Sequence, residues 1–158
     1  MAIVRSGFAQ DQPHDLVRIL ELARGRYTCT ALGADRQLEQ LTVLTVKGSP
    51  PPAELRRGSA TQDDLKRVQA LLEQPEIRSS ASQPVRVPQV MIEPDGGYIA
   101  VLARVDDKPK LIQFTDVKGQ KTMPQFLKGF HSFAEDIRRR KLPKTGGKVT
   151  PSCELSMR

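Results

Sequence analysis

The feature that most constrains this fold is an apolar stripe near the end of the chain, between residues 124 and 141. Its members recur at helical spacing, after Pro124 at the first turn, and they are Phe126, Leu127, Phe130, Phe133, Ala134 and Ile137. Such a stripe predicts an amphipathic helix packed on a sheet. Each buried phenylalanine would stabilise the fold by about 1.5–3 kcal/mol, so we interpret the rings as core and not as a base-stacking surface.

Two earlier segments also have helical patterns. Thr61-Gln62-Asp63-Asp64 resembles a capping box, and the apolar stripe after it predicts a helix over residues 62–74. Leu16, Ile19, Leu20 and Ala23 recur at helical spacing between Pro13 and Gly25, which predicts a short amphipathic helix over residues 15–23.

The remaining regular structure reads as β-strands. Alternation over residues 26–32 and 37–47, with turn residues between them, predicts a hairpin, and residues 48–60 read as a proline-rich loop. Residues 75–88 read as a long connection. Turn signals at residues 94–97 and 106–109 then divide a meander of three strands over residues 90–93, 98–105 and 110–117.

These elements predict one α+β domain, which suits a chain of 158 residues. We expect an antiparallel sheet of four or five strands, packed by two main helices and a short N-terminal helix. The predicted boundaries are a flexible N-terminus over residues 1–12, the domain over residues 13–143, and a basic flexible tail over residues 144–158.

Charge is unevenly distributed along the chain. Residues 1–117 hold 15 Lys and Arg against 15 Asp and Glu, so the whole net charge of +7 lies in the last quarter. A basic quarter on a neutral body attracts anions, although cations at the end of a helix also complement its dipole. The candidate contacts for an anion or a partner are Arg138, Arg139, Arg140, Lys141, Lys144 and Lys148.

The two cysteines, Cys29 and Cys153, lie far apart in the sequence. They form no C-x-x-C pair, which disfavours a metal site. Two free thiols and one long disulfide are equally consistent with the sequence. A disulfide would contribute about 4 kcal/mol through loop entropy in an oxidising compartment.

The patterns of catalysis and of cofactor binding are missing from the sequence. Only His14 and His131 are present, without H-E-x-x-H, G-x-S-x-G or G-x-G-x-x-G, and Lys144–Lys148 fails the phosphate-loop pattern. We therefore expect neither enzymatic activity nor a cofactor or metal. An undetected hydrolase would need a polar pocket that one sequence does not reveal.

The N-terminal sequence and the hydropathy of the chain bear on its localisation. Ser6-Gly7-Phe8-Ala9 resembles the tail of a cleaved leader, and no segment approaches the ~20 apolar residues of a membrane span. We therefore favour export slightly over the cytoplasm and expect no membrane span.

The order of elements from Leu38 to Ile137 adds a family resemblance. A strand, the helix TQDDLKRVQALL, the hairpin DGGYIAVLARVDDKPKLIQF and an apolar helix resemble small exported bacterial α+β domains of the emfourin type. The best-known members of that family inhibit metalloproteases. The resemblance implies a similar fold, and no inhibitory residues are carried over from it.

The sequence thus favours a non-catalytic protein-interaction module, in its sharper version an exported protease-inhibitor-like domain, with an unidentified protein partner. The alternative is weak, sequence-independent nucleic-acid binding through the basic quarter.

Overall fold

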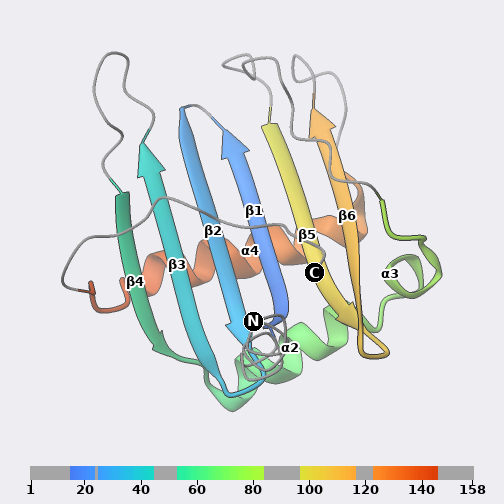
Figure 1. Ribbon diagram of the computed structural model, residues 1–158, viewed down its shortest axis with the longest axis horizontal. Helices are drawn as coiled ribbons and strands as arrows, with labels where there is room; N and C mark the ends of the chain where they lie inside the picture. Colours follow the sequence, from blue (N-terminus) through green and yellow to red (C-terminus); the bar gives the residue numbers. More distant parts are fainter. Residues whose placement is uncertain (1–14, 24, 45–52, 84–96, 117–122, 146–158) are drawn as a thin grey trace, which may run out of the picture.

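The computed structural model describes residues 15–23, 25–44, 53–83, 97–116 and 123–145. Within these ranges the chain forms one six-stranded antiparallel sheet, in the order β4-β3-β2-β1-β5-β6, and three helices (Figure 1). The elements in chain order are β1 (Asp15–Ala23), β2 (Arg26–Gly33), β3 (Gln37–Leu44), β4 (Ala53–Ser59), α2 (Gln62–Leu72), α3 (Pro75–Ser79), β5 (Gly97–Val105), β6 (Lys108–Asp116) and α4 (Gln125–Arg140).

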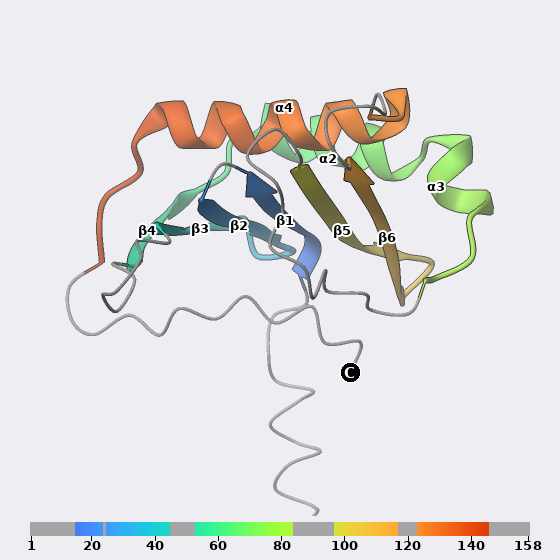
Figure 2. The same ribbon diagram turned by 90° about the horizontal axis from the view of Figure 1, so that it is seen from above.

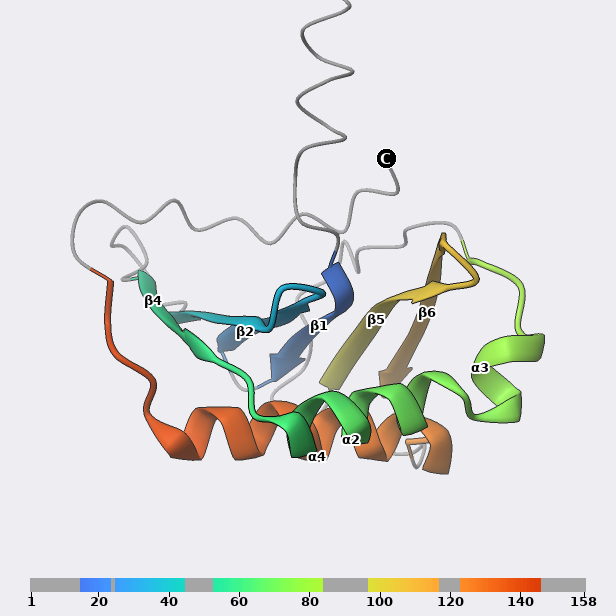
Figure 3. The same cartoon turned by 90° about the horizontal axis from the view of Figure 1, so that it is seen from below.

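The helices lie on one side of the sheet. Figure 2 and Figure 3 show α4 running across the strands, with α2 beside it on the same face. The main core fills the space between this helix-covered face and the two helices, and it includes Val17, Ile19, Ile99 and Val101 from the strands. No described helix covers the other face of the sheet, which we call the helix-free face.

The apolar stripe of α4 packs as its spacing predicts. Phe130 and Phe133 are both 0% exposed, and Leu127, Ala134 and Ile137 are also buried in the main core. Phe126 is partly buried at the edge of the same cluster. The phenylalanine side of the helix is therefore core, as predicted.

The local signals for α2 and for two hairpins are also confirmed. The Thr61 hydroxyl accepts a hydrogen bond from the Asp64 N–H, and the Asp64 carboxylate accepts one from the Thr61 N–H, which completes the capping box. Strands β2 and β3 pair as the first predicted hairpin. Strands β5 and β6 pair across a two-residue turn in which Asp106 and Asp107 both have positive φ. The strand predicted at residues 90–93 lies outside the described residues.

The predicted N-terminal helix over residues 15–23 is wrong, because this segment is strand β1. It lies in the middle of the sheet, paired with β2 and with β5, so it is apolar on both faces. Val17 and Ile19 join the helix-side core, whereas Leu20 joins a cluster on the helix-free face. On a segment this short, apolar residues on both faces of a strand can also match helical spacing. Hydrogen-bonded pairing along both edges of the segment favours the strand.

The predicted number of strands is wrong as well, because the sheet has six strands and not four or five. The third described helix is α3, after α2, and not an N-terminal helix. Residues 53–59, expected in a loop, form edge strand β4, where Leu55 pairs with Leu41. Its charged residues hide the strand pattern, as is common at sheet edges. The expected long connection after residue 75 contains α3, which places Ile77 in the core at 0% exposed.

We predict that Phe133→Ala lowers the free energy of unfolding by about 3–5 kcal/mol, because it opens a cavity beneath a helix with no solvent access. The measurement is urea denaturation followed by far-UV circular dichroism. Lys128→Ala, on the exposed side of the same helix, should change the free energy by less than about 0.5 kcal/mol. Equal effects of the two substitutions would contradict the packing described here.

Candidate functional site

The helix-free face is built from rows of side chains that run across the six strands. The strand register gives three such rows: Ala53, Val43, Tyr27, Leu22, Tyr98 and Thr115; Leu55, Leu41, Cys29, Leu20, Ala100 and Gln113; Arg57, Glu39, Ala31, Arg18, Leu102 and Leu111. Because alternate residues of a strand share a face, the register alone places these residues together.

The rows divide the face into two halves of different character. The first two rows are almost wholly apolar, and we call them the apolar half. The third row and the strand ends beyond it, at the β2–β3 turn, carry charges, and we call this part the polar half. Leu20, Leu41 and Val43 in the apolar half are only 5–6% exposed.

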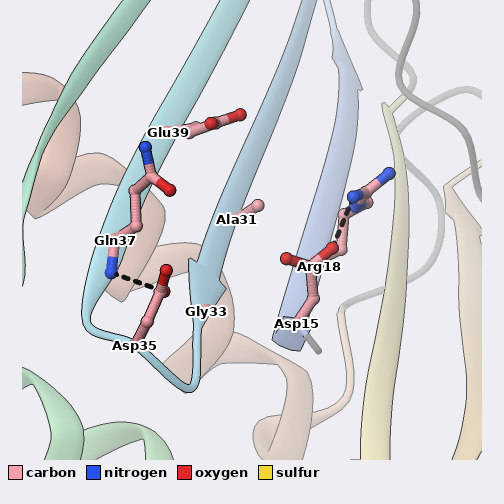
Figure 4. Close-up of a pocket in the computed structure, with 7 residues that line it drawn as sticks. All are labelled: Asp15, Arg18, Ala31, Gly33, Asp35, Gln37 and Glu39. Atoms are coloured by element: carbon pink, nitrogen blue, oxygen red, sulfur yellow. Dashed lines mark hydrogen bonds and ion pairs between the residues drawn. The ribbon is translucent and has the colours of Figure 1, made fainter. Parts of the chain in front are cut away.

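The polar half contains a hollow of about 300 Å³, shown in Figure 4. It is lined by Asp15, Arg18, Ala31, Gly33, Asp35, Gln37 and Glu39. Arg18 pairs with Asp15, and the Asp35 carboxylate accepts a hydrogen bond from the Gln37 N–H at 3.1 Å. Glu39 pairs with Arg57 of the next strand at 3.0 Å. The lining therefore has three carboxylates and one guanidinium.

Both edges of the sheet have hydrogen bonds to neighbouring segments. At β4, the Arg57 N–H donates to the Pro143 carbonyl and the Thr145 N–H donates to the Leu55 carbonyl. At β6, the Leu111 N–H donates to the Ser82 hydroxyl, and the Gln83 N–H donates to the Leu111 carbonyl. These contacts reduce the capacity of either edge to pair with a strand of another chain.

Three members of the predicted basic cluster are held in ion pairs. Arg138 bonds Glu135 at 2.6 Å, one turn earlier on α4, and Lys144 lies 3.2 Å from Glu54. Arg140 donates two hydrogen bonds of 2.6 Å to Asp64. These three side chains therefore already have carboxylate partners within the chain.

The rest of the cluster is less constrained. The Arg139 and Lys141 side chains are exposed, and no ion pair joins either of them to another described residue. Lys148 lies outside the described residues. The predicted contact of this cluster with an anion or a partner therefore stays a prediction.

The Arg140–Asp64 pair links the end of α4 to the start of α2. The Asp64 side chain is only 4% exposed, and its carboxylate also caps Thr61. The hydrogen bonds from Arg140 lower the pKa of Asp64 to about 2, against the opposing effect of burial. Asp64 is therefore ionised at neutral pH, where its carboxylate accepts hydrogen bonds from Arg140 and from the Thr61 N–H.

Cys29 lies on the helix-free face, 8% exposed, beside Leu41 and Val43. Its predicted partner, Cys153, lies outside the described residues, so the pairing stays a prediction. His131 projects from α4 on the opposite side of the sheet and bonds Glu21, which raises the pKa of His131. Because the sheet separates Cys29 from His131, these two residues do not form a nucleophile–base pair.

Two further features are missing from the described part of the chain. Among its residues, no group of three or more His, Cys, Asp or Glu side chains is placed to hold a metal ion. The same residues contain no helix that is long and apolar enough to cross a membrane.

Comparison with known protein families finds no family model that matches the chain. No curated protein matches it either. The resemblance to emfourin-type domains therefore remains a prediction.

The helix-free face was missed by sequence reasoning, although one signal for it was present. Cys29 shares a face with Tyr27 by alternation along β2, and the same rule applies to Leu20 and Leu22 once β1 is known to be a strand. Because β1 was interpreted as a helix, its members of the two apolar rows, Leu20 and Leu22, could not be placed on a sheet face.

We predict that Asp64→Asn destabilises the protein at neutral pH and flattens its acid response. A carboxylate whose pKa is about 2 when folded and about 3.9 when unfolded contributes about 2 kcal/mol, present above pH 4 and lost as the pH falls towards 2. Urea denaturation between pH 6 and pH 2 measures this difference, and the two proteins should converge at the acid end.

The matched control is Asp63→Asn, which removes the same charge from the neighbouring, exposed position of α2. Asp63→Asn should still lose free energy of unfolding between pH 4 and pH 2, as the wild type does. If Asp64→Asn and Asp63→Asn had the same pH profile, the Arg140 pair would not be the cause.

Proposed function

We propose that the protein is a non-catalytic binding module whose protein partner inserts a basic side chain into the hollow of the polar half. The observation that carries this proposal is the lining of the hollow, where three carboxylates outnumber one guanidinium. A lysine or arginine of a partner would find acceptors there, and opposite charges would also favour its approach.

The hollow is held in shape by its own strands and turn. Arg36 adopts a positive φ of 70° between β2 and β3, and Asp35 fixes the start of β3 through the Gln37 N–H. Asp15 and Arg18 are paired on the central strand. A site preformed in this way requires little ordering when a partner binds, which favours affinity.

The polar lining fits a side chain of a protein better than a small organic ligand. Small-molecule pockets start at about 300 Å³ and are lined mainly by apolar groups. The volume of this hollow is at the lower limit of that range, and five of its seven lining residues are charged or carry an amide. The closed sheet edges further favour a partner that contacts the face of the sheet.

The emfourin-type resemblance supplies a sharper version of the proposal, namely inhibition of a secreted metalloprotease. This version rests on the order of elements alone. It therefore specifies a class of partner to test and no inhibitory residue.

The test mixes the purified chain with a secreted bacterial zinc metalloprotease and measures residual peptidase activity and complex formation by size-exclusion chromatography. We expect a stable complex that is weakened about tenfold by the double substitution Asp35→Asn and Glu39→Gln, since removing a charged contact costs about 1.4 kcal/mol or more. Asparagine keeps the hydrogen bond to the Gln37 N–H.

The control is Glu73→Gln with Glu76→Gln, which removes two exposed charges from the helical side. It should leave binding unchanged. A complex that is insensitive to both pairs would contradict the role of the hollow, and failure to bind any such protease would remove the inhibitor version.

The nucleic-acid alternative makes a separate prediction. Of the five described cations in the basic cluster, Arg139 and Lys141 are the two outside the ion pairs described above, so few phosphate contacts are available. We expect single-stranded DNA to bind with Kd above about 10 μM at 150 mM salt, and log Kd to depend on log salt with a slope below about 2. Fluorescence anisotropy from 50 to 300 mM salt checks this, and steep, tight binding lost in Arg139→Ala with Lys141→Ala would favour the alternative.

A further inference from the structure

We propose that residues 146–158 form a strap across the apolar half of the helix-free face, fastened to β2 by a disulfide between Cys29 and Cys153. This proposal is independent of the proposed function, because the hollow lies in the polar half. It assigns one occupant, a segment of this chain, to a sheet face that no described helix covers.

The start of the strap is fixed by contacts at the edge of β4. After α4 the chain passes Leu142 and then forms an antiparallel bridge between Lys144 and Arg56. The Thr145 N–H donates to the Leu55 carbonyl at 2.9 Å, and its hydroxyl donates to the same carbonyl at 3.2 Å. Because Leu55 is the first member of the second apolar row, Thr145 lies at the rim of the apolar half.

The far end of the strap would lie two strands further in. Cys29 pairs with Leu41, and Leu41 pairs with Leu55, so one row leads from the rim to the cysteine. Adjacent strands are about 4.8 Å apart, which puts β2 about 10 Å from β4. The eight residues from Thr145 to Cys153 can span up to about 28 Å, so the sequence length is sufficient.

The burial of the apolar half points to a cover. Leu20, Tyr98 and Leu41 are 3–6% exposed although α2, α3 and α4 all lie on the opposite face. Side chains on one sheet face shield one another only in part, so burial this deep favours a further layer. Thr145 places the start of residues 146–158 at the rim of this face, and their sequence carries Val149, Pro151, Leu155 and Met157.

The cysteine chemistry agrees with this path. Cys29 is in the disulfide-bonded form, and the sequence has one other cysteine, Cys153. To form the bond, the two thiols lose two protons and two electrons to a disulfide oxidant such as oxidised glutathione, which is reduced to two glutathione thiols. The strap would therefore be closed in an oxidising compartment and released by reductants.

The first measurement is peptide mapping without reduction. Trypsin should release Tyr27–Arg36 joined to Val149–Arg158 as one disulfide-linked species, which separates on treatment with a phosphine reductant. Recovery of either peptide alone, with its cysteine alkylated before reduction, would overturn the proposal.

The second measurement tests whether the strap covers the apolar half. The chain has two tyrosines and no tryptophan, and Tyr27 and Tyr98 both lie in the apolar half, so tyrosine fluorescence reports on this surface. Acrylamide quenching should increase at least twofold in full-length Cys153→Ser, or in the reduced wild-type protein, while far-UV circular dichroism stays unchanged. Ser152→Ala is the matched control and should quench like the wild type.

Removal of the disulfide should also lower Tm by roughly 10 °C, as expected for a cross-link that closes a long loop. Unchanged quenching in the folded Cys153→Ser and reduced proteins would show that the strap does not cover the face. Loss of the strap should leave binding at the hollow intact, so failure of this proposal and failure of the proposed function are distinguishable.

Discussion

The packing of α4 against the sheet is the interaction on which the rest of the structure depends. Its apolar stripe places Phe130 and Phe133 out of contact with solvent. The helix runs across the strands with α2 beside it (Figure 2). Both helices then lie on one face of the sheet, and no described helix covers the other face. The division between a core face and a helix-free face, and hence both proposals above, follows from this one-sided packing.

Three of the five described cations of the basic cluster that follows the stripe are held in ion pairs. Arg140 joins the end of α4 to the capping box of α2, and Lys144 lies against β4 where the chain turns around the sheet edge. Buried or partly buried carboxylates require such partners, because an unpaired charge is costly away from water. A run of positive charge in a sequence can thus reflect several unrelated contacts, each with its own element.

Sequence reasoning recovered the elements with local signals. The stripe of α4, the capping box of α2 and the β2–β3 hairpin are set by residues close in the chain. Strands β1 and β4 were missed because their identity depends on pairing with distant segments: β1 is apolar on both faces because it has two neighbours, and β4 is charged because it is an edge. The candidate site is a property of register across six strands, so it became visible only when Leu20, Cys29 and Leu41 were placed in one row.

The most direct test of this account is native-state hydrogen exchange across urea concentrations, read separately for α4 and for the central strands. If α4 and the sheet form one core, amides of Leu127–Ile137 and of β1 should exchange through the same global opening, with the same free energy and the same dependence on urea. If the α4 amides instead exchanged with a much lower free energy and no dependence on urea, the helix would open on its own, and the one-sided core described here would be contradicted.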